Sequence, residues 1–175
     1  MNDDNINSKL GEFFTNSLHE MYWCEFHLVD VLTTMTDVAT SAELRDAFNT
    51  HRDQTRKHVE RIERAFEMLG IVPEPRSCTG LQGLFDEGWQ MINDTETGSA
   101  QRDVALIIAA QKVEHYEIAT YGSLVTLAKT LGRKDVAKEL QKTLEEEKET
   151  DALLTQIAEA SINEEASEEP ATVNQ

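Results

Sequence analysis

Apolar residues recur every three or four positions along four long stretches of the chain, which is the spacing that places them on one face of an α-helix. The pattern predicts long helices over residues 10–38, 42–69, 100–131 and 134–160. Two of the three prolines fall in residues 70–80, which we therefore expect to form a loop. A short helix over residues 81–92 and a turn over residues 93–99 follow. The sequence therefore predicts an all-α fold.

The order of these helices indicates a ferritin-like four-helix bundle. Tight connections join the first long helix to the second and the third to the fourth, whereas the connection from the second to the third is long and carries the short helix. We expect one bundle domain over residues 1–161. The segment INEEASEEPATVNQ (162–175) is acidic and has few apolar residues, which predicts a disordered tail.

Polar residues interrupt the apolar face near the middle of every long helix, where an antiparallel bundle would bring them to similar depth. They are Glu25 on the first helix, His51, Gln54 and His58 on the second, Glu114, Glu117 and Tyr121 on the third, and Glu147 and Asp151 on the fourth. Buried carboxylates repel one another and take up protons unless cations balance their charge. We therefore predict that the two histidines, Gln54 and the acidic residues bind two divalent metal ions.

The ligand types narrow the choice of metal. Carboxylate oxygens and imidazole nitrogens suit iron or manganese, and also zinc, whereas the absence of thiolates from this face argues against iron–sulfur or copper(I) chemistry. The i, i+3 spacing of Glu114 and Glu117 places both carboxylates on one side of a helix, as chelation and bridging require. Iron is our first expectation, with manganese or zinc as alternatives.

Several of these residues also have ordinary structural interpretations. His51 and His58 share a helix face, and each could equally be a hydrogen-bonded core histidine. Tyr121 is either a hydrogen-bond partner of a metal-bound carboxylate or a packed core tyrosine. The three consecutive glutamates at positions 145–147 are typical of a solvent-exposed helix surface, so most of this run is expected to be solvated. We expect the remaining histidines, His19, His27 and His115, to be exposed.

Composition limits the possible partners. The 33 acidic and 16 basic residues give a net charge of −17, and no cluster of Lys and Arg suits a phosphate backbone, so nucleic acid is not an expected partner. The acidity has two explanations: solubility in a salty cytosol, or attraction of cations. The polar N-terminus does not resemble a signal peptide, and no apolar run approaches the ~20 residues of a membrane span. We expect a cytoplasmic protein.

Four segments of the chain resemble the YciE/YciF family of bacterial ferritin-like stress proteins. The segments are WCEFHLV (23–29), HRDQTRKHVERIE (51–63), VEHYEIATYGSLVTLA (113–128) and LEEEKETD (144–151), and the resemblance extends over about residues 8–160. It implies a five-helix ferritin-like fold, usually a homodimer, with a di-metal site comparable to that of rubrerythrin. The ligands it implies are Glu25, position 54 with a neighbour, Glu114, Glu117, and Glu147 with a neighbour.

The sequence departs from the family pattern His-x-Glu-Glu-Thr at one position, where it reads His51-Arg52-Asp53-Gln54-Thr55. Gln54 offers a carbonyl oxygen but lacks the negative charge, so we expect weaker metal binding or one firmly and one loosely held ion. His58, where relatives often carry Gln, is a candidate for compensation.

Three functions are consistent with this pattern. The first is an oxidoreductase that reacts with peroxide or dioxygen, and the second is a protein that binds metal without turnover. The third is a structural stress protein in which the polar core fixes the helix register. The chain lacks a rubredoxin-like CxxC module, so the oxidoreductase would need an external electron donor.

Overall fold

Helices make up nearly all of the chain that the structure, a computed structural model, describes, namely residues 5–171. They are α1 (Lys9–Val38), α2 (Ala42–Leu69), α3 (Thr79–Asn93), α4 (Ala100–Thr130), α5 (Lys134–Ile157), the π-helical turn η2 (Ala158–Ile162) and α6 (Asn163–Glu168). Residues 5–171 contain no strand. The predicted all-α fold, with a short helix in the long connection, is confirmed.

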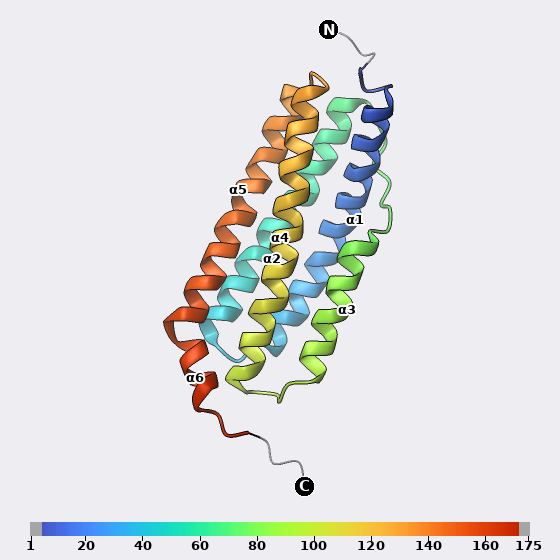
Figure 1. Cartoon of the computed structure of the whole chain (residues 1–175). Helices are drawn as coiled ribbons and strands as arrows, with labels where there is room; N and C mark the ends of the chain where they lie inside the picture. Colours follow the sequence, from blue (N-terminus) through green and yellow to red (C-terminus); the bar gives the residue numbers. More distant parts are fainter. Residues whose placement is uncertain (1–4, 172–175) are drawn as a thin grey trace.

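The bundle consists of α1, α2, α4 and α5, and α3 packs against its outside beside α4 (Figure 1). α1 contacts α2 along its length, α4 contacts α5 in the same way, and α2 contacts α5. Residues 39–41 and 131–133 form the two tight connections. Each of these pairs is therefore antiparallel, which brings the centres of all four helices to the same level of the bundle.

Apolar side chains fill the bundle on both sides of this central level. Phe14, Leu18 and Phe66 lie in the part near the start of α1, and Leu32, Met35 and Phe48 lie in the part near its end; all are at most 5% exposed. Burial of each such side chain contributes roughly 1.5–3 kcal/mol to folding. No helix within residues 5–171 combines the length and the apolar character that crossing a bilayer requires.

His19 does not have the exposure that the sequence pattern predicted. The prediction of a solvent-facing ring is wrong, because the connection between α2 and α3 runs back along α1 and covers it. The imidazole is 5% exposed and stacks on Phe66, with 4.6 Å between the ring centroids. Its Nδ1 accepts a hydrogen bond from the backbone N–H of Glu74 at 3.2 Å. His27 and His115 are exposed, as predicted.

The structure also differs from the sequence prediction at the C-terminal end, where helix continues to Glu168 rather than ending at residue 160. The π-helical turn rotates the chain so that Ile162 is buried in the core at 2% exposure. Beyond α6 the Glu169 carboxylate accepts the backbone N–H groups of Ala100 and Gln101 at 2.6 and 3.0 Å. This carboxylate therefore caps α4. Positions 172–175 of the expected tail lie outside the described residues.

A buried carboxylate on α4 holds the tight connection between α1 and α2. Asp103 is 2% exposed and accepts hydrogen bonds from the backbone N–H groups of Thr40 and Ser41 at 2.8 and 2.7 Å. These are charge-assisted bonds to groups at a helix N-terminus. Asp103 thus ties the start of α2 to α4.

We predict that Asp103→Ala lowers the free energy of unfolding by about 1–3 kcal/mol, because two partly buried backbone N–H groups lose their charged acceptor. Urea unfolding followed by circular dichroism measures the change. Asp37→Ala, which removes an exposed acidic residue of α1, is the matched control and should change stability by no more than about 0.5 kcal/mol. Equal effects of the two substitutions would contradict this role.

Candidate metal centre

Six acidic and imidazole side chains converge in the middle of the bundle. They are Glu25 from α1, His51 and His58 from α2, Glu114 and Glu117 from α4, and Glu147 from α5, and none is more than 2% exposed. The interval of seven residues, about two helical turns, sets His51 and His58 on the same side of α2 with ring centroids 6.3 Å apart. The polar interruptions of the four apolar faces therefore meet in one place.

The six residues divide into two groups with metal-ligand spacing. His51, Glu114, Glu117 and Glu147 form one group, and Glu25, His58 and Glu147 form the other. Within each group one nitrogen or oxygen per residue lies within 4.8 Å of all the others. Glu147 belongs to both groups, so its carboxylate joins them into one cluster.

The fit to a metal pair is tested by the polar atoms that lack hydrogen-bond partners. Within the described residues, ten buried side-chain nitrogens and oxygens have none, and eight of them belong to these six side chains. They include both carboxylate oxygens of Glu117 and Glu147, together with Nε2 of His51 and Nδ1 of His58. Buried polar atoms are otherwise almost always paired. The eight unsatisfied atoms of the cluster are carboxylate oxygens and imidazole nitrogens, which are the ligand types of a hard or borderline cation.

Without a metal ion, the carboxylates and imidazoles of the cluster must balance one another's charge, and this sets which of them carry protons. His51 Nε2 lies 3.1 Å from Glu114 Oε1, and His58 Nδ1 lies 2.9 Å from Glu147 Oε1, although neither contact has hydrogen-bond direction. Burial lowers the pKa of His51, but Glu114 and Glu147 outweigh it and raise the value to about 9. Burial raises the pKa of Glu114 to about 7 and, with the neighbouring carboxylates, holds that of Glu117 well above its usual range.

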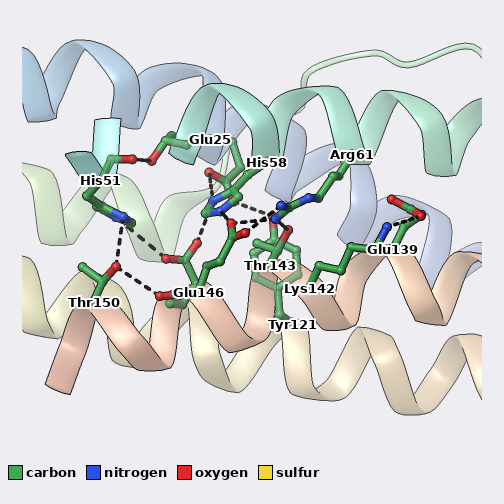
Figure 2. Close-up of polar contacts among 12 residues, drawn as sticks. Glu25, His51, His58, Arg61, Tyr121, Glu139, Lys142, Thr143, Glu146 and Thr150 are labelled. Atoms are coloured by element: carbon green, nitrogen blue, oxygen red, sulfur yellow. Dashed lines mark hydrogen bonds and ion pairs between the residues drawn. The ribbon is translucent and has the colours of Figure 1, made fainter. Parts of the chain in front are cut away.

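The outer nitrogen of His58 is held by an ion pair that the sequence did not reveal. His58 Nε2 lies 2.8 Å from Oε2 of Glu146, and Arg61 donates to both oxygens of the same carboxylate at 2.7 Å (Figure 2). The hydrogen bond from His58, opposed by partial burial and helped by Arg61, lowers the pKa of Glu146 to about 2. A charged Glu146 accepts the Nε2 proton, so Nδ1 faces Glu25 and Glu147 and would offer its lone pair to a metal ion when the ring is neutral.

A neutral group holds the outer nitrogen of His51. The Thr150 hydroxyl lies 3.3 Å from His51 Nδ1 and donates its own hydrogen to the Glu146 carbonyl at 3.1 Å. The hydroxyl oxygen is therefore left to accept the Nδ1 proton of His51. His51 consequently presents Nε2 to Glu114, and both histidines direct one nitrogen to the centre.

Tyr121 occupies the position next to Glu25 that a supporting hydrogen-bond donor requires. Its ring is fully buried, and its hydroxyl donates to Oε1 of Glu25 at 2.5 Å. The second oxygen of Glu25 lacks a hydrogen-bond partner and lies 3.4 Å from His58 Nδ1. This contact fixes the carboxylate and leaves one oxygen directed inward.

Two residues expected in the site lie elsewhere. Asp151, one turn beyond Glu147, accepts a hydrogen bond from Gln111 Nε2 at 3.1 Å and lies 3.2 Å from His115 Nε2, on the seam between α4 and α5. Gln54 is half-buried, and its side chain forms no hydrogen bond with another residue in the described part of the chain. Their roles as ligands stay predictions, which this placement does not favour.

The chain is similar to known proteins over most of its length. The family model described as "Domain of unknown function (DUF892)" matches residues 9–167. Protein YciF of Escherichia coli K12 is 40% identical over 158 residues, which are 90% of this chain and 95% of YciF. The crystal structure of the E. coli stress protein YciF has a TM-score of 0.84 at 39% identity, covering 89% of this chain and 98% of that chain.

Two further solved structures share the fold. YcfI of Rhodopseudomonas palustris, described as a candidate structural protein, has a TM-score of 0.82 at 30% identity, covering 85% of this chain and 94% of YcfI. A Xanthomonas campestris protein has a TM-score of 0.72 at 21% identity, covering 91% of this chain and 97% of that protein, and supports the fold alone.

We predict that chelator-treated protein loses stability as the pH rises from about 5 to about 9. The proton bound by His51 contributes stability that is complete below pH 6.5 and is lost as the pH passes 9. Glu114 holds its proton more tightly in the folded than in the unfolded state, so its contribution to stability is also lost as the pH rises from 4.5 to about 7. The combined effect should be on the order of 1–3 kcal/mol, measured by urea unfolding at each pH.

Two substitutions test the origin of this pH dependence. Glu114→Gln removes a carboxylate from the buried cluster, and Glu149→Gln, the control, removes one from the exposed surface. The first should flatten the pH dependence, whereas the second should leave it close to that of the wild type. If Glu114→Gln leaves the slope of the free energy of unfolding against pH unchanged, repulsion between surface charges alone would account for the loss of stability.

We also predict that Glu146→Gln weakens the binding of Mn(II) or Zn(II) roughly 10–100-fold, because the charged partner of His58 is lost. Isothermal titration calorimetry gives the affinity, and nitrogen NMR of the His58 ring gives its tautomer. Glu145→Gln, one residue away and exposed, is the control and should leave both unchanged. Unaltered affinity in Glu146→Gln would contradict the role of this ion pair.

Proposed function

The chain belongs to the DUF892 family, that of YciF, and we propose that it is a ferritin-like protein that binds two divalent metal ions and reacts with peroxide or dioxygen. The proposal rests on the eight buried, unpartnered ligand atoms that converge from four helices. In the proposed site, His51, Glu114 and Glu117 would hold one ion, Glu25 and His58 would hold the other, and Glu147 belongs to both groups of ligands.

The balance of charge supports a pair of divalent ions. Four carboxylates enter the centre, and the two imidazoles together supply at most two positive charges. Two divalent ions match the four negative charges while leaving both histidines neutral, which is the state in which they bind metal. The oxygen and nitrogen ligands suit iron first, with manganese or zinc as alternatives.

Iron or manganese at this position would supply the redox chemistry, and the protein's own groups would hold the site and exclude water. Tyr121 fixes Glu25, and the ion pair of Glu146 with Arg61 fixes His58. Electrons for turnover would come from an external donor. The relative in E. coli is named a stress protein, which is consistent with a role in handling oxidants.

The alternative is a protein that binds metal without turnover, or whose polar core is structural. It is favoured by the contacts of His51 and His58 with the carboxylates, which neutralise part of the charge without any ion. The description of YcfI as a candidate structural protein also favours this alternative.

We further propose a homodimer. Phe13 and Phe26 on α1 are 61% and 60% exposed, and exposed aromatic side chains of this kind support an interface with a second copy.

We predict about two metal ions per chain in protein purified without chelator under iron- or manganese-replete conditions, measured by elemental analysis. Glu117→Gln should lower this number and abolish metal-dependent peroxide consumption. Because burial favours the protonated form of Glu117, the amide imitates it and the variant should fold. The exposed Glu149→Gln serves as the matched control.

The three candidate functions predict different results in these metal and peroxide measurements. Metal uptake with no peroxide or dioxygen consumption above that of Glu117→Gln supports binding without turnover. Fewer than about one ion per chain, together with a melting temperature that chelation leaves unchanged, supports the structural role and contradicts the metal proposal.

A further inference from the structure

A pocket of about 470 Å³ opens at the end of the bundle where α1 begins, α2 ends and α4 turns into α5 (Figure 1). Its volume lies within the range of roughly 300–1,000 Å³ that is typical of pockets for small molecules. None of the six side chains of the acidic cluster lines it. The lining residue of α1 nearest to Glu25 is His19, six positions before it, which is about 9 Å along a helix. The pocket is therefore separate from the proposed metal site.

Two arginines from different segments line this pocket. Arg76 lies in the connection between α2 and α3, and its guanidinium donates to the side-chain oxygen of Asn16 on α1. Arg133 lies in the turn before α5, where it donates to the Met68 carbonyl at 2.5 Å and pairs with Asp135 at 3.0 Å. These contacts hold both side chains in place. Within residues 5–171, each guanidinium keeps N–H groups that have no partner and are available to a ligand.

A buried histidine places a further donor beside Arg76. Asn16 and His19 are neighbours on the surface of α1, and the backbone N–H of Arg76 donates to the His19 carbonyl at 3.1 Å. Since Nδ1 of His19 accepts the backbone N–H of Glu74, the proton of the neutral ring lies on Nε2. His19 lines the pocket at 5% exposure, and its Nε2 forms no hydrogen bond with another residue of the part described. Polar groups on buried rings are usually paired, so a ligand that accepts this proton would complete the site.

The charge of the lining limits the kind of ligand. Burial lowers the pKa of His19, and the charge of Arg76 acts in the same direction although the contact with Glu74 opposes it, so the ring is neutral near pH 7. Among the described residues that line the pocket, Glu12 is the only carboxylate, against two guanidinium groups. An apolar wall completes the lining: Leu69, Ile71 and Leu131. A ligand with one negative charge and an apolar body matches these surroundings, whereas a doubly charged ligand exceeds the available positive charge.

We propose that this pocket binds a small organic monocarboxylate with an apolar body. The carboxylate would accept N–H groups of Arg76 and the Nε2 proton of His19, Arg133 would add positive charge, and the carbon skeleton would lie against the apolar wall. Guanidinium groups suit this task because their planar fork matches the two oxygens of a carboxylate. No metal ion takes part, so the proposal is independent of the proposed function.

The test titrates 3-phenylpropanoate into full-length, ¹⁵N-labelled protein treated with chelator and follows binding by NMR. We expect saturable shifts of the backbone amides of Gly70 and Ile71 and of the His19 Nε2–H signal. The neutral analogue 3-phenylpropanamide has nearly the same shape and should bind at least roughly tenfold more weakly, because it lacks the charge. Phenyl phosphate, mostly doubly charged at pH 7.5, should also bind more weakly than the carboxylate.

Substitutions of charged lining residues should act in opposite directions. Arg76→Gln should weaken the binding of 3-phenylpropanoate roughly tenfold or more, whereas Glu12→Gln, which removes the opposing charge, should strengthen it severalfold. Arg56→Gln, which removes an exposed arginine of α2 outside the pocket, is the matched control and should leave the affinity unchanged. Circular dichroism checks that each variant is folded.

Several results would overturn the proposal. They are the absence of saturable binding to the wild-type protein, equal affinity for the carboxylate and the amide, and shifts confined to residues outside the pocket. Tighter binding of phenyl phosphate would assign the pocket to phosphate esters instead of carboxylates. If Arg76→Gln does not fold, the comparison of the three ligands on the wild-type protein still decides the question. Metal analysis of untreated protein is a separate measurement, so failure of the metal proposal is distinguishable from failure of this one.

Discussion

Neutralisation of buried negative charge is the constraint on which the centre of this bundle depends. Four carboxylates lie at no more than 1% exposure where an ordinary bundle has leucine or valine. Two imidazoles cannot balance them, so the protein alone must keep protons on Glu114 and Glu117, whose pKa values burial raises. Two divalent ions would replace those protons. The proposed binding of metal and the acid–base behaviour of the cluster therefore express the same constraint.

The surrounding structure keeps these charged groups in place. Antiparallel packing brings the helix centres to one level, and apolar layers on both sides exclude water from it. Outer hydrogen bonds fix the direction of three of the six side chains: Tyr121 holds Glu25, Thr150 holds His51, and Glu146 holds His58. The result is a centre whose inward atoms are unsatisfied, as the proposed metal site would require.

Helix periodicity predicted the bundle and the convergence of its polar residues, because each depends on one helix face at a time. It placed Glu147 on the inner face but did not predict the role of Glu146, because only the position of α2 brings His58 and Arg61 to that carboxylate. The same limit applies to Asp151, which turns to Gln111 and His115. His19 was missed because a loop, which has no periodicity, covers it.

The two halves of the centre have unequal surroundings, and this difference does not involve Gln54, whose role as a ligand stays a prediction. Gln54 predicted unequal binding through a missing charge at a ligand position, yet its side chain lies half-exposed. The asymmetry in the structure comes from the outer partners. His58 is supported by a carboxylate held ionised by Arg61, whereas His51 is supported by a neutral hydroxyl. A charged partner makes an imidazole a stronger donor, while the His51 side gains a ligand through Glu117. In the proposed site, the number of ligands on one side and the basicity of the ligand on the other would compensate, so that both positions could hold an ion without the charge that Gln54 lacks.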